Sequence, residues 1–478
     1  MNNRNILVLA ICSLLAACNP KGNTADYVSI PIVNKAIEDT TSVYYADYKT
    51  YPSDLKSLPV GVFDSGTGGL TVLEAFLGLD QFNNASGAEG ADGIPDFKGE
   101  NFTYLADQAN MPYGNYSSAG KLDYFRELVV KDALFLTKEP NRSKIVVIAC
   151  NTATAYGLPD VENLLERGIP SVKVVGVINA GVNASLDKVN VTENAAVGVM
   201  ATVGTIASGG YQNTIARIAG ERGYKGTIKV VCQPGLGFAE AVDMERDFID
   251  KSATRPRDNY RGPVVGTDSL SINPDLLDRY NFDFSNNAVL YEKKGEKYTK
   301  IQLNSAANYA RFHIVNLIER HRLQNNGLPM KNIILGCTHY PFFLDTLKKV
   351  IEELRSYQQN GVRIYEIILS NDLGFIDPAI YTAKEVYELL RNDKILSVSG
   401  QQGCLNAYIS VPAKGLDAKN LDENGNLTYD FKYGREAGSE IQTVDFVPFS
   451  KSNINPDNLL RIKERLPLSY KLIEQTIK

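Results

Sequence analysis

Two short segments of this chain match each other, and each ends in a cysteine that follows an apolar run. They are Lys144-Ile-Val-Val-Ile-Ala-Cys150-Asn-Thr and Lys331-Asn-Ile-Ile-Leu-Gly-Cys337-Thr-His. A run of β-branched residues followed by a small polar residue is typical of a buried parallel strand that ends where a helix begins. A thiol at such a junction lies over backbone N–H groups at the positive end of a helix dipole, which favours its thiolate form. Two such cysteines indicate a pair of acid/base groups on opposite sides of one substrate.

A glycine-rich segment precedes each cysteine segment, in the same order both times. Val60-Gly-Val-Phe-Asp64-Ser-Gly-Thr-Gly-Gly69 is echoed by Val197-Gly-Val-Met-Ala-Thr-Val-Gly-Thr205, and the interval to the cysteine is longer in the second copy. This order predicts two pseudo-symmetric α/β halves, with an insertion in the second. Alternating strand and helix patterns predict doubly wound lobes with parallel sheets, and an active site in the cleft between them.

The length of 478 residues is enough for two or three domains. We expect a first lobe that the C-terminal segment completes, and a second lobe inserted between the two parts of the first. One strand of the second lobe is expected at residues 364–368. The expected ranges are a signal peptide at 1–17, a tether at 18–57, the first lobe at 58–190 and 375–478, and the second lobe at 191–374 with an insertion at about 246–300.

Composition and charge exclude several classes of function. The formal net charge is −5 and no basic run stands out, so the sequence does not indicate a nucleic-acid partner. The three histidines are His313, His321 and His339, and the chain has neither a Cys-x-x-Cys pair nor a His-Glu-x-x-His motif. We therefore expect no metal site.

The amino terminus has the pattern of a processing signal. A weakly basic start is followed by an apolar run at 6–17, which is too short to span a bilayer comfortably. Leu15-Ala16-Ala17-Cys18 resembles the bacterial lipobox, in which the cysteine is acylated, and an uncleaved signal anchor is the alternative. The lipobox predicts a membrane partner through a lipid anchor at Cys18, and a location in the cell envelope facing the periplasm or exterior. Thiols can pair in such a compartment, so this interpretation requires Cys150 and Cys337 to stay free.

Four motifs follow one another between residues 58 and 395. They are Gly61-Val-Phe-Asp64-Ser65-Gly-Thr-Gly-Gly, Tyr104-Leu-Ala-Asp107 with Pro112-Tyr113-Gly114, Ala149-Cys150-Asn151-Thr152-Ala-Thr-Ala, and Leu335-Gly-Cys337-Thr338-His339-Tyr-Pro341. In sequence and in order they resemble the signatures of the glutamate racemase family. The resemblance implies racemisation of an amino acid without a cofactor, with conversion of L-glutamate to D-glutamate as the first expectation.

Racemisation requires that a proton leave one face of the α-carbon and another arrive on the opposite face. Two thiols, one ionised and one not, meet this demand. By the resemblance, Cys150 and Cys337 are these two bases. The sequence alone also permits both to be small buried hydrophobic side chains.

Three further residues resemble the groups that assist the thiols. Asp64 corresponds to the assistant of Cys150, and His339 to that of Cys337. Glu240 lies where the family has an acidic assistant. Considered alone, Asp64 also fits a helix cap, His339 a core histidine and Glu240 a solvated helix carboxylate.

Polar groups at helix starts supply the predicted substrate site. Hydroxyl, amide and backbone N–H groups at such places suit a substrate carboxylate. We expect Tyr113 and Gly114 to contribute through backbone as much as side chain, and an ordinary Pro-Tyr-Gly turn is the alternative. A dinucleotide site is excluded because the third glycine of its fingerprint would fall at Thr71. The predicted substrate-binding residues are Asp64, Ser65, Tyr113, Gly114, Asn151, Thr152, Thr338 and His339.

The chain also departs from the family pattern. Asn179 and Ala180 stand where Glu and Pro are usual, and neither the insertions nor the segment after Ile395 has a counterpart. D-Glutamate for peptidoglycan is used in the cytoplasm, whereas a lipobox places the chain outside it. The alternatives are a related racemase acting on aspartate, a hydantoin or a malonate, and an inactive surface lipoprotein that binds amino acids. The sequence leaves a homodimer open.

Overall fold

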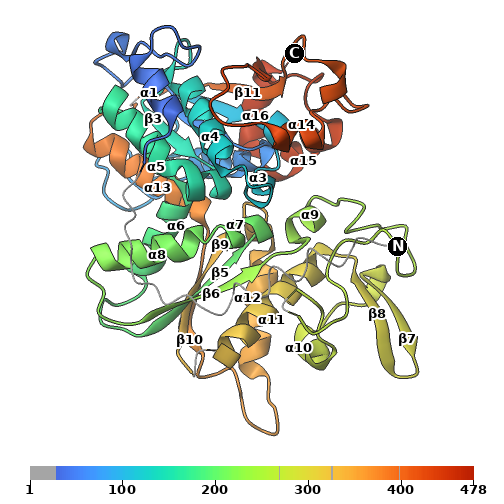
Figure 1. The fold of residues 1–478 in the computed structure, drawn as a ribbon. Coiled ribbons are helices and arrows are strands. Elements are labelled where there is room, and N and C mark those ends of the chain that lie inside the picture. The colour runs from blue at the N-terminus through green and yellow to red at the C-terminus, as the bar shows by residue number, and fades with distance from the viewer. Residues whose placement is uncertain (1–27, 269, 325–326, 398, 478) are drawn as a thin grey trace.

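Two α/β lobes make up the protein, one above the other in Figure 1. The structure is a computed structural model that describes residues 28–268, 270–324, 327–397 and 399–477. The predicted signal peptide and Cys18 lie outside these residues. The first lobe has a six-stranded sheet in the order β12 (Val444–Pro448), β11 (Leu405–Pro412), β2 (Phe102–Ala106), β1 (Val60–Asp64), β3 (Ile145–Ile148) and β4 (Lys173–Gly176). The second lobe has a four-stranded sheet in the order β10 (Leu369–Ile376), β9 (Met330–Gly336), β5 (Ala195–Ala201) and β6 (Ile228–Pro234).

All neighbouring strands in these two sheets run parallel, except for the antiparallel pair β11 and β12. The helices that cover the first sheet are α1 (Pro31–Glu38), α2 (Leu70–Gly78), α4 (Leu122–Thr137), α5 (Asn151–Gly168), α13 (Pro378–Asn392), α15 (Pro456–Arg465) and α16 (Pro467–Thr476). Those that cover the second are α6 (Val177–Asp187), α8 (Gly210–Glu221), α9 (Phe238–Val242), α11 (Ala306–Gln324) and α12 (Leu344–Ser356). The predicted fold class is confirmed.

The central strands of each sheet, such as β1 and β5, are buried on both faces, and successive strand residues point to opposite sides. In β1, Val60 and Val62 pack in a core with α2, α13 and α16, whereas Phe63 packs in a core with α1, α4 and α5. In β5, Val199 packs with α6 and α8, whereas Met200 packs with α11 and α12. Burial on both sides explains why these strands are almost wholly apolar in sequence.

The C-terminal segment returns to the first lobe. Strand β11 pairs in parallel with β2, and β12 pairs antiparallel with β11. Helix α16 packs on α2 and along β11, next to α15. In Figure 1 these red elements lie beside the blue and cyan elements from the first half of the chain.

Helix α6 lies between the lobes, which shifts the predicted lobe boundary. That boundary was expected after residue 190, so that α6 would belong to the first lobe. Ile178, Val182 and Leu186 instead pack in the core of the second sheet. The opposite side of α6 contacts α13 of the first lobe. The second lobe therefore begins at α6, directly after β4 ends.

The expected tether through residue 57 is wrong from residue 30 onward. Helix α1 packs Ile32, Val33 and Ala36 in one core with α4 and α5. Its proline in the first turn needs no hydrogen-bond partner, and its apolar residues share one face. A helix of eight residues is too short to be stable alone, so this burial holds it in place.

Two local predictions in the second lobe are also wrong. Residues 364–368 form turns, and the strand that follows is β10. Tyr365 and Ile368 are buried in this turn region, which gives it the apolar pattern of a strand. After Cys337 the chain makes a turn and a 3-10 helix, η6 (Tyr340–Phe343), before α12 begins. The two cysteine segments are therefore equivalent as strands but not as helix starts.

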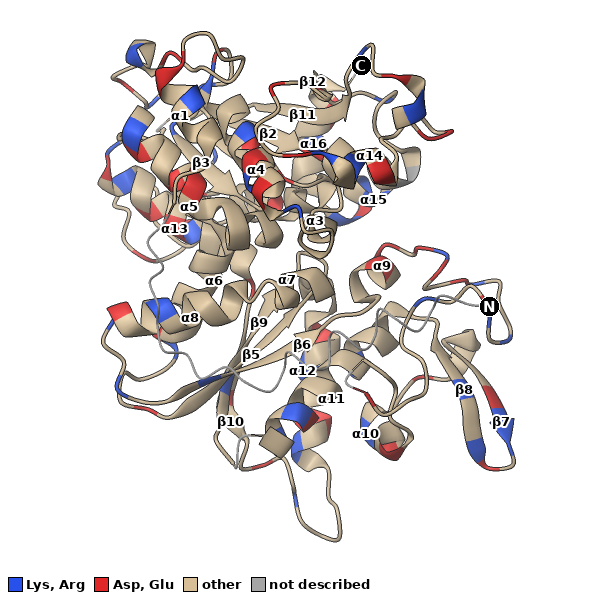
Figure 2. Cartoon of the chain, viewed as in Figure 1, with Lys and Arg blue, Asp and Glu red and all other residues tan. Residues whose placement is uncertain are grey.

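The insertion at about 246–300 carries α10 (Leu277–Tyr280) and an antiparallel hairpin of β7 (Val289–Lys294) and β8 (Lys297–Leu303). Acidic and basic residues are interspersed over both lobes in the view of Figure 2. None of the described helices combines the length and apolar character that crossing a bilayer requires.

Candidate active site

Cys150 lies at the junction between β3 and α5. The strand ends at Ile148, and Cys150 is the N-cap residue of the helix, with extended backbone angles of φ −99° and ψ 123°. Its sulfur is buried and makes no capping hydrogen bond to the helix, although the nearby Ala153 N–H favours the thiolate. The predicted strand-to-helix junction is confirmed for this cysteine.

Asp64 lies beside Cys150 because β1 and β3 are parallel neighbours whose ends meet at one edge of the sheet. Its Oδ2 accepts a hydrogen bond of 2.6 Å from the Gly69 N–H, and its carboxylate lies close enough to the Cys150 thiol for each to affect the pKa of the other. The Ser65 hydroxyl donates to Asp64 Oδ1 at 3.4 Å and lies 3.9 Å from the Cys150 sulfur. Asp64 therefore caps the turn after β1 and contacts the thiol as well.

The charge state of Cys150 differs from the expectation. Burial raises the pKa of the Cys150 thiol and the Asp64 carboxylate raises it further, against the backbone N–H groups of Ala153 and Ser65. The expected preference for a thiolate is wrong here because desolvation and a neighbouring negative charge outweigh the helix terminus. A neutral thiol at this place suits a proton donor.

Cys337 lies at the carboxyl end of β9, at the corresponding edge of the second sheet. Its sulfur is 3.6 Å from Nδ1 of His339. The other ring nitrogen, Nε2, is 3.1 Å from Oδ1 of Asp243. The imidazole thus lies between a sulfur and a carboxylate, the arrangement that activates a nucleophile or base.

His339 is held in its cationic form. Burial alone would lower its pKa, but Asp243 and Cys337 together raise the pKa of His339 to about 10. The two thiols therefore have opposite surroundings, with a carboxylate next to Cys150 and a cation next to Cys337.

Asp243 is a site residue that no sequence motif indicated. It is the C-cap residue of α9, one helical turn after the predicted assistant Glu240. The ion pair of His339 is made with Asp243, whereas Glu240 acts on His339 through its charge. Burial raises the pKa of Glu240. The only available signal was the three-residue spacing, which places both carboxylates on one helix face.

Groups from the two lobes meet around Gly68. A Cβ built on this glycine would lie 3.4 Å from Asp64 Oδ2, 3.6 Å from Thr338 Oγ1 and 4.0 Å from His339 Cε1. The assistants of both cysteines therefore converge on one point. A side chain at residue 68 would lie in van der Waals contact with these three groups and would occupy the space between them.

A second contact joins the lobes on the other side of Cys150. The hydroxyl of Tyr211, on α8, donates to Asn151 Oδ1 at 2.8 Å. Gly114 also lies against Gly204 of the second lobe, since a Cβ on Gly114 would come within 3.7 Å of the Gly204 Cα. Asn151 and Gly114, both predicted site residues, thus lie at the interface of the lobes.

Two further predicted substrate-binding residues, Thr152 and Thr338, closely follow the two cysteines in the chain. Thr152 follows Asn151 in the first turn of α5, where backbone N–H groups have no partner within the helix. Thr338 is partly exposed, with its hydroxyl 3.4 Å from His339 Nδ1. Asn151, Thr152 and Thr338, together with Ser65, can present hydrogen-bond donors to a substrate carboxylate.

The side chain of Tyr113 was expected to contribute to the substrate site, but the structure places it inside the first lobe. Its ring is buried, and its hydroxyl is 2.6 Å from Asp107 Oδ2 and 2.7 Å from Asp132 Oδ2. Burial and the charge of Asp107 raise the pKa of Asp132 far above its ordinary value. The hydroxyl of Tyr113 is therefore within donating distance of two carboxylates and is already satisfied within the lobe. What Tyr113 offers a ligand is its backbone.

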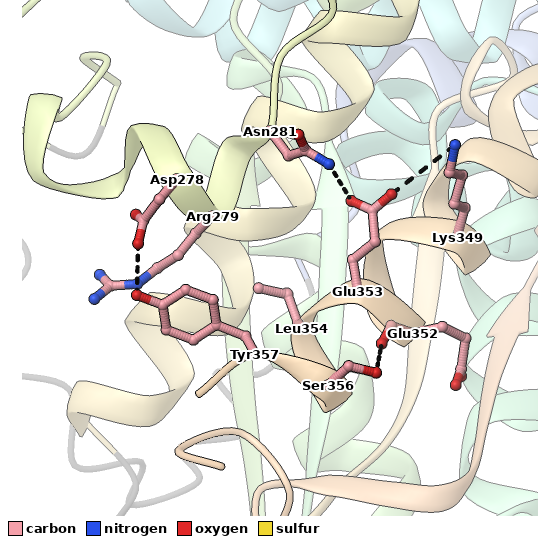
Figure 3. Close-up of a pocket in the computed structure, with 9 residues that line it drawn as sticks. All are labelled: Asp278, Arg279, Asn281, Lys349, Glu352, Glu353, Leu354, Ser356 and Tyr357. Atoms are coloured by element: carbon pink, nitrogen blue, oxygen red, sulfur yellow. Dashed lines mark hydrogen bonds and ion pairs between the residues drawn. The ribbon is translucent and has the colours of Figure 1, made fainter. Parts of the chain in front are cut away.

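Two cavities border the second lobe. One of about 410 Å³ lies between the lobes and is lined by Thr338, Thr71 and Asp377 among others. The larger, of about 540 Å³, lies at α10 and α12 and contains neither cysteine. Figure 3 shows that its side chains pair with one another, as Tyr357 does with Asp278 and Glu353 with Asn281. The cavity at Thr338 is not lined by either cysteine, but Thr338 directly follows Cys337 in the chain.

The four cysteines among the described residues, Cys150, Cys232, Cys337 and Cys404, are all free thiols. This agrees with the requirement that the two site cysteines remain unpaired. The described residues contain no group of three or more His, Cys, Asp or Glu side chains arranged to hold a metal ion.

Comparison with known proteins gives one consistent result. A glutamate racemase from Chlorobium phaeobacteroides is 33% identical over 339 residues, which cover 71% of the chain and 82% of that protein. One from Carboxydothermus hydrogenoformans is 26% identical over 391 residues, covering 82% of the chain and 99% of that protein. A solved glutamate racemase from Bacillus anthracis has a TM-score of 0.43 at 21% identity and covers 74% of the chain and 88% of that protein. No family model matches the chain.

Proposed function

Because the chain belongs to the glutamate racemase family, we propose that it interconverts L- and D-glutamate by a two-thiol mechanism without a cofactor. The observation that carries this proposal is the opposite charge next to two thiols whose assistants converge on Gly68. A racemase needs one sulfur that takes a proton and one that gives a proton, and these surroundings supply both.

In the proposed reaction, the Cys337 sulfur removes the α-proton from one face of the substrate. The C–H bond breaks as an S–H bond forms, and the electron pair remains on the α-carbon. The Cys150 thiol then delivers its proton to the opposite face, which forms the new C–H bond and leaves a thiolate. The reverse reaction exchanges the two roles, so no oxidant or reductant is needed.

The neighbouring groups have distinct roles in this proposal. The His339 imidazolium supports negative charge on Cys337 before proton removal. The Asp64 carboxylate keeps the proton on Cys150 until the carbanion forms. The N–H groups at the start of α5, with Asn151, Thr152 and Thr338, hold the substrate carboxylate and so place the α-carbon between the sulfurs.

Exchange of the α-proton tests the proposal directly. Full-length protein is incubated with L-glutamate and, separately, D-glutamate in heavy water, and deuterium at the α-carbon and the enantiomeric ratio are followed. We expect deuterium incorporation together with loss of optical activity from either enantiomer. Exchange with aspartate but not glutamate would assign the chain another substrate, and binding without exchange for any amino acid would make it a binding protein.

We also propose that Cys18 carries a lipid anchor, because the sequence before it resembles a lipobox. The expected result is that the protein fractionates with membranes and that its amino-terminal peptide has the mass of an acylated cysteine. Cys18→Ser is expected to release it. A soluble wild-type protein with an unmodified Cys18 would refute the anchor.

A further inference from the structure

Helix α15 belongs to the first lobe by packing but contacts the second lobe with its charged residues. Ile462 and Leu466, four residues apart, are buried in the core of the first lobe. Arg461 and Arg465 have the same spacing and therefore share the adjoining face of the helix. This face is turned toward the end of α9, which carries Asp243, and toward η6, which follows His339 in the chain.

Both arginines bind the end of α9. Arg461 Nη1 lies 2.9 Å from Asp243 Oδ1, the same oxygen that faces His339. Arg465 Nη2 donates to the Val242 carbonyl at 3.0 Å, one of the carbonyls left without a partner at a helix end. The helix C-terminus carries partial negative charge, so two cations are favourable there.

Arg465 also contacts the segment that follows His339. Its guanidinium lies over the ring of Phe342 in η6, 5.1 Å from the ring centre. The two arginines thus hold both the carboxylate partner of His339 and the 3-10 helix that His339 precedes. On the side of the first lobe, both contacts are made by residues of α15.

We propose that Arg461 and Arg465 are positioning residues that fix Asp243, and through it His339, against Cys337. This deepens the racemase proposal and rests on it, because it assigns part of the acid/base apparatus to the C-terminal extension. The carboxylate of Asp243 is partly exposed and receives two cations at one oxygen. With Arg461 in place, the carboxylate has a fixed orientation toward the imidazole. Because α15 is anchored in the opposite lobe, the arrangement is complete only when the lobes are together.

The charge around Cys337 provides a test that needs no substrate. Wild-type protein and Arg461→Gln are alkylated with iodoacetamide from pH 6 to pH 10, and modification of Cys337, Cys150 and exposed Cys404 is followed by peptide mass spectrometry. We expect Cys337 in the variant to react about five times more slowly at pH 7, with an unchanged rate at Cys404. Lys463→Gln removes a positive charge from the exposed side of the same helix and is expected to match wild type.

Arg461→Lys keeps the charge but not the planar guanidinium, and we expect an intermediate rate. If Arg461→Gln does not fold, Arg461→Lys is used as the test by itself. Modification of Cys337 that is slower in this variant than in wild type supports the proposal. A wild-type rate and pH profile at Cys337 in the arginine variants would overturn it. The racemase proposal is tested separately by α-proton exchange, so a chain without exchange activity would still give an answer here.

Discussion

Lys144 and Lys331 occupy equivalent positions at the starts of β3 and β9, and each pairs with one glutamate, but only Lys144 is fully buried. Its Nζ lies 2.8 Å from Glu100, with side chains 0% and 1% exposed. The Nζ of Lys331 lies 2.8 Å from Glu193, with side chains 18% and 30% exposed. Lys144 Nζ also donates to the carbonyls of Lys56 and Ile395. The pseudo-symmetry of the lobes therefore repeats the ion pair but not its burial.

This difference predicts unequal stability losses. Lys144→Ala leaves a buried carboxylate without its partner, so we expect a loss of about 3–5 kcal/mol in unfolding free energy. The matched variant Lys331→Ala removes two ion pairs near the surface, with Glu193 and with Asp372, and is expected to cost no more than about 1 kcal/mol. Urea unfolding of both variants measures the difference, and equal losses would contradict the argument.

Replacing either site thiol is expected to abolish racemisation while the fold remains. Cys150→Ser and Cys337→Ser keep the size of the side chain but replace the thiol with a much weaker acid. The loss is expected to be about a thousandfold or more. The control is Cys404→Ser, because that thiol is exposed and away from the site. Wild-type exchange in either site variant would remove that thiol from the mechanism.

The His339–Asp243 pair predicts a pH dependence of stability. The folded-state pKa of His339 is raised from its ordinary value of 6.5 to about 10, so its stabilising contribution is complete below pH 6.5 and is lost as the pH rises to about 10. Each unit by which the pKa is raised corresponds to at most about 1.4 kcal/mol. The charged or titratable groups that act on His339 are Asp243, Cys337 and Glu240.

Asp243→Asn removes the largest contribution that raises this pKa. We expect the unfolding free energy of wild type to fall more steeply between pH 6.5 and pH 10 than that of the variant. Urea unfolding at several pH values measures both slopes. Parallel curves would show that His339 is not held as a cation by Asp243.

Gly69→Ala tests the position of Asp64. A Cβ at residue 69 would lie 2.5 Å from the Asp64 Cβ and 3.0 Å from the Tyr104 hydroxyl, so Asp64 must move away from Cys150. We expect exchange activity to fall at least tenfold. The matched control is Gly220→Ala, in α8, where an added Cβ has no neighbour within 4 Å. Normal activity in Gly69→Ala would show that the position of Asp64 is not critical.

The positions of the two cysteines could be predicted from sequence because strand patterns and their ends are local features. Apolar runs at residues 145–148 and 333–335 identify buried strands, and parallel strands end at one edge of a sheet. Helix α1 was not predictable in the same way. Its buried face has only three apolar residues, and it is stable only against α4 and α5, which are distant in sequence.

The electrostatics of the site depended on contacts that no local pattern contains. The charge state of Cys150 follows from burial and from Asp64, which lies far away in sequence. Asp243 resembles any carboxylate at the end of a short helix, and its role follows only from its distances to His339 and Arg461. The segment after Ile395 has no family motif, so nothing in sequence connected Arg461 to the site.

The unequal surroundings of the two sulfurs affect what happens between catalytic cycles. The Asp64 carboxylate favours a proton on the Cys150 sulfur, whereas the imidazole of His339 lies beside the Cys337 sulfur. Each completed conversion leaves that proton on the opposite side, and water or buffer must return it before the same enantiomer can react again. The proposed mechanism therefore includes a proton transfer that resets the two sulfurs between turnovers of the same enantiomer.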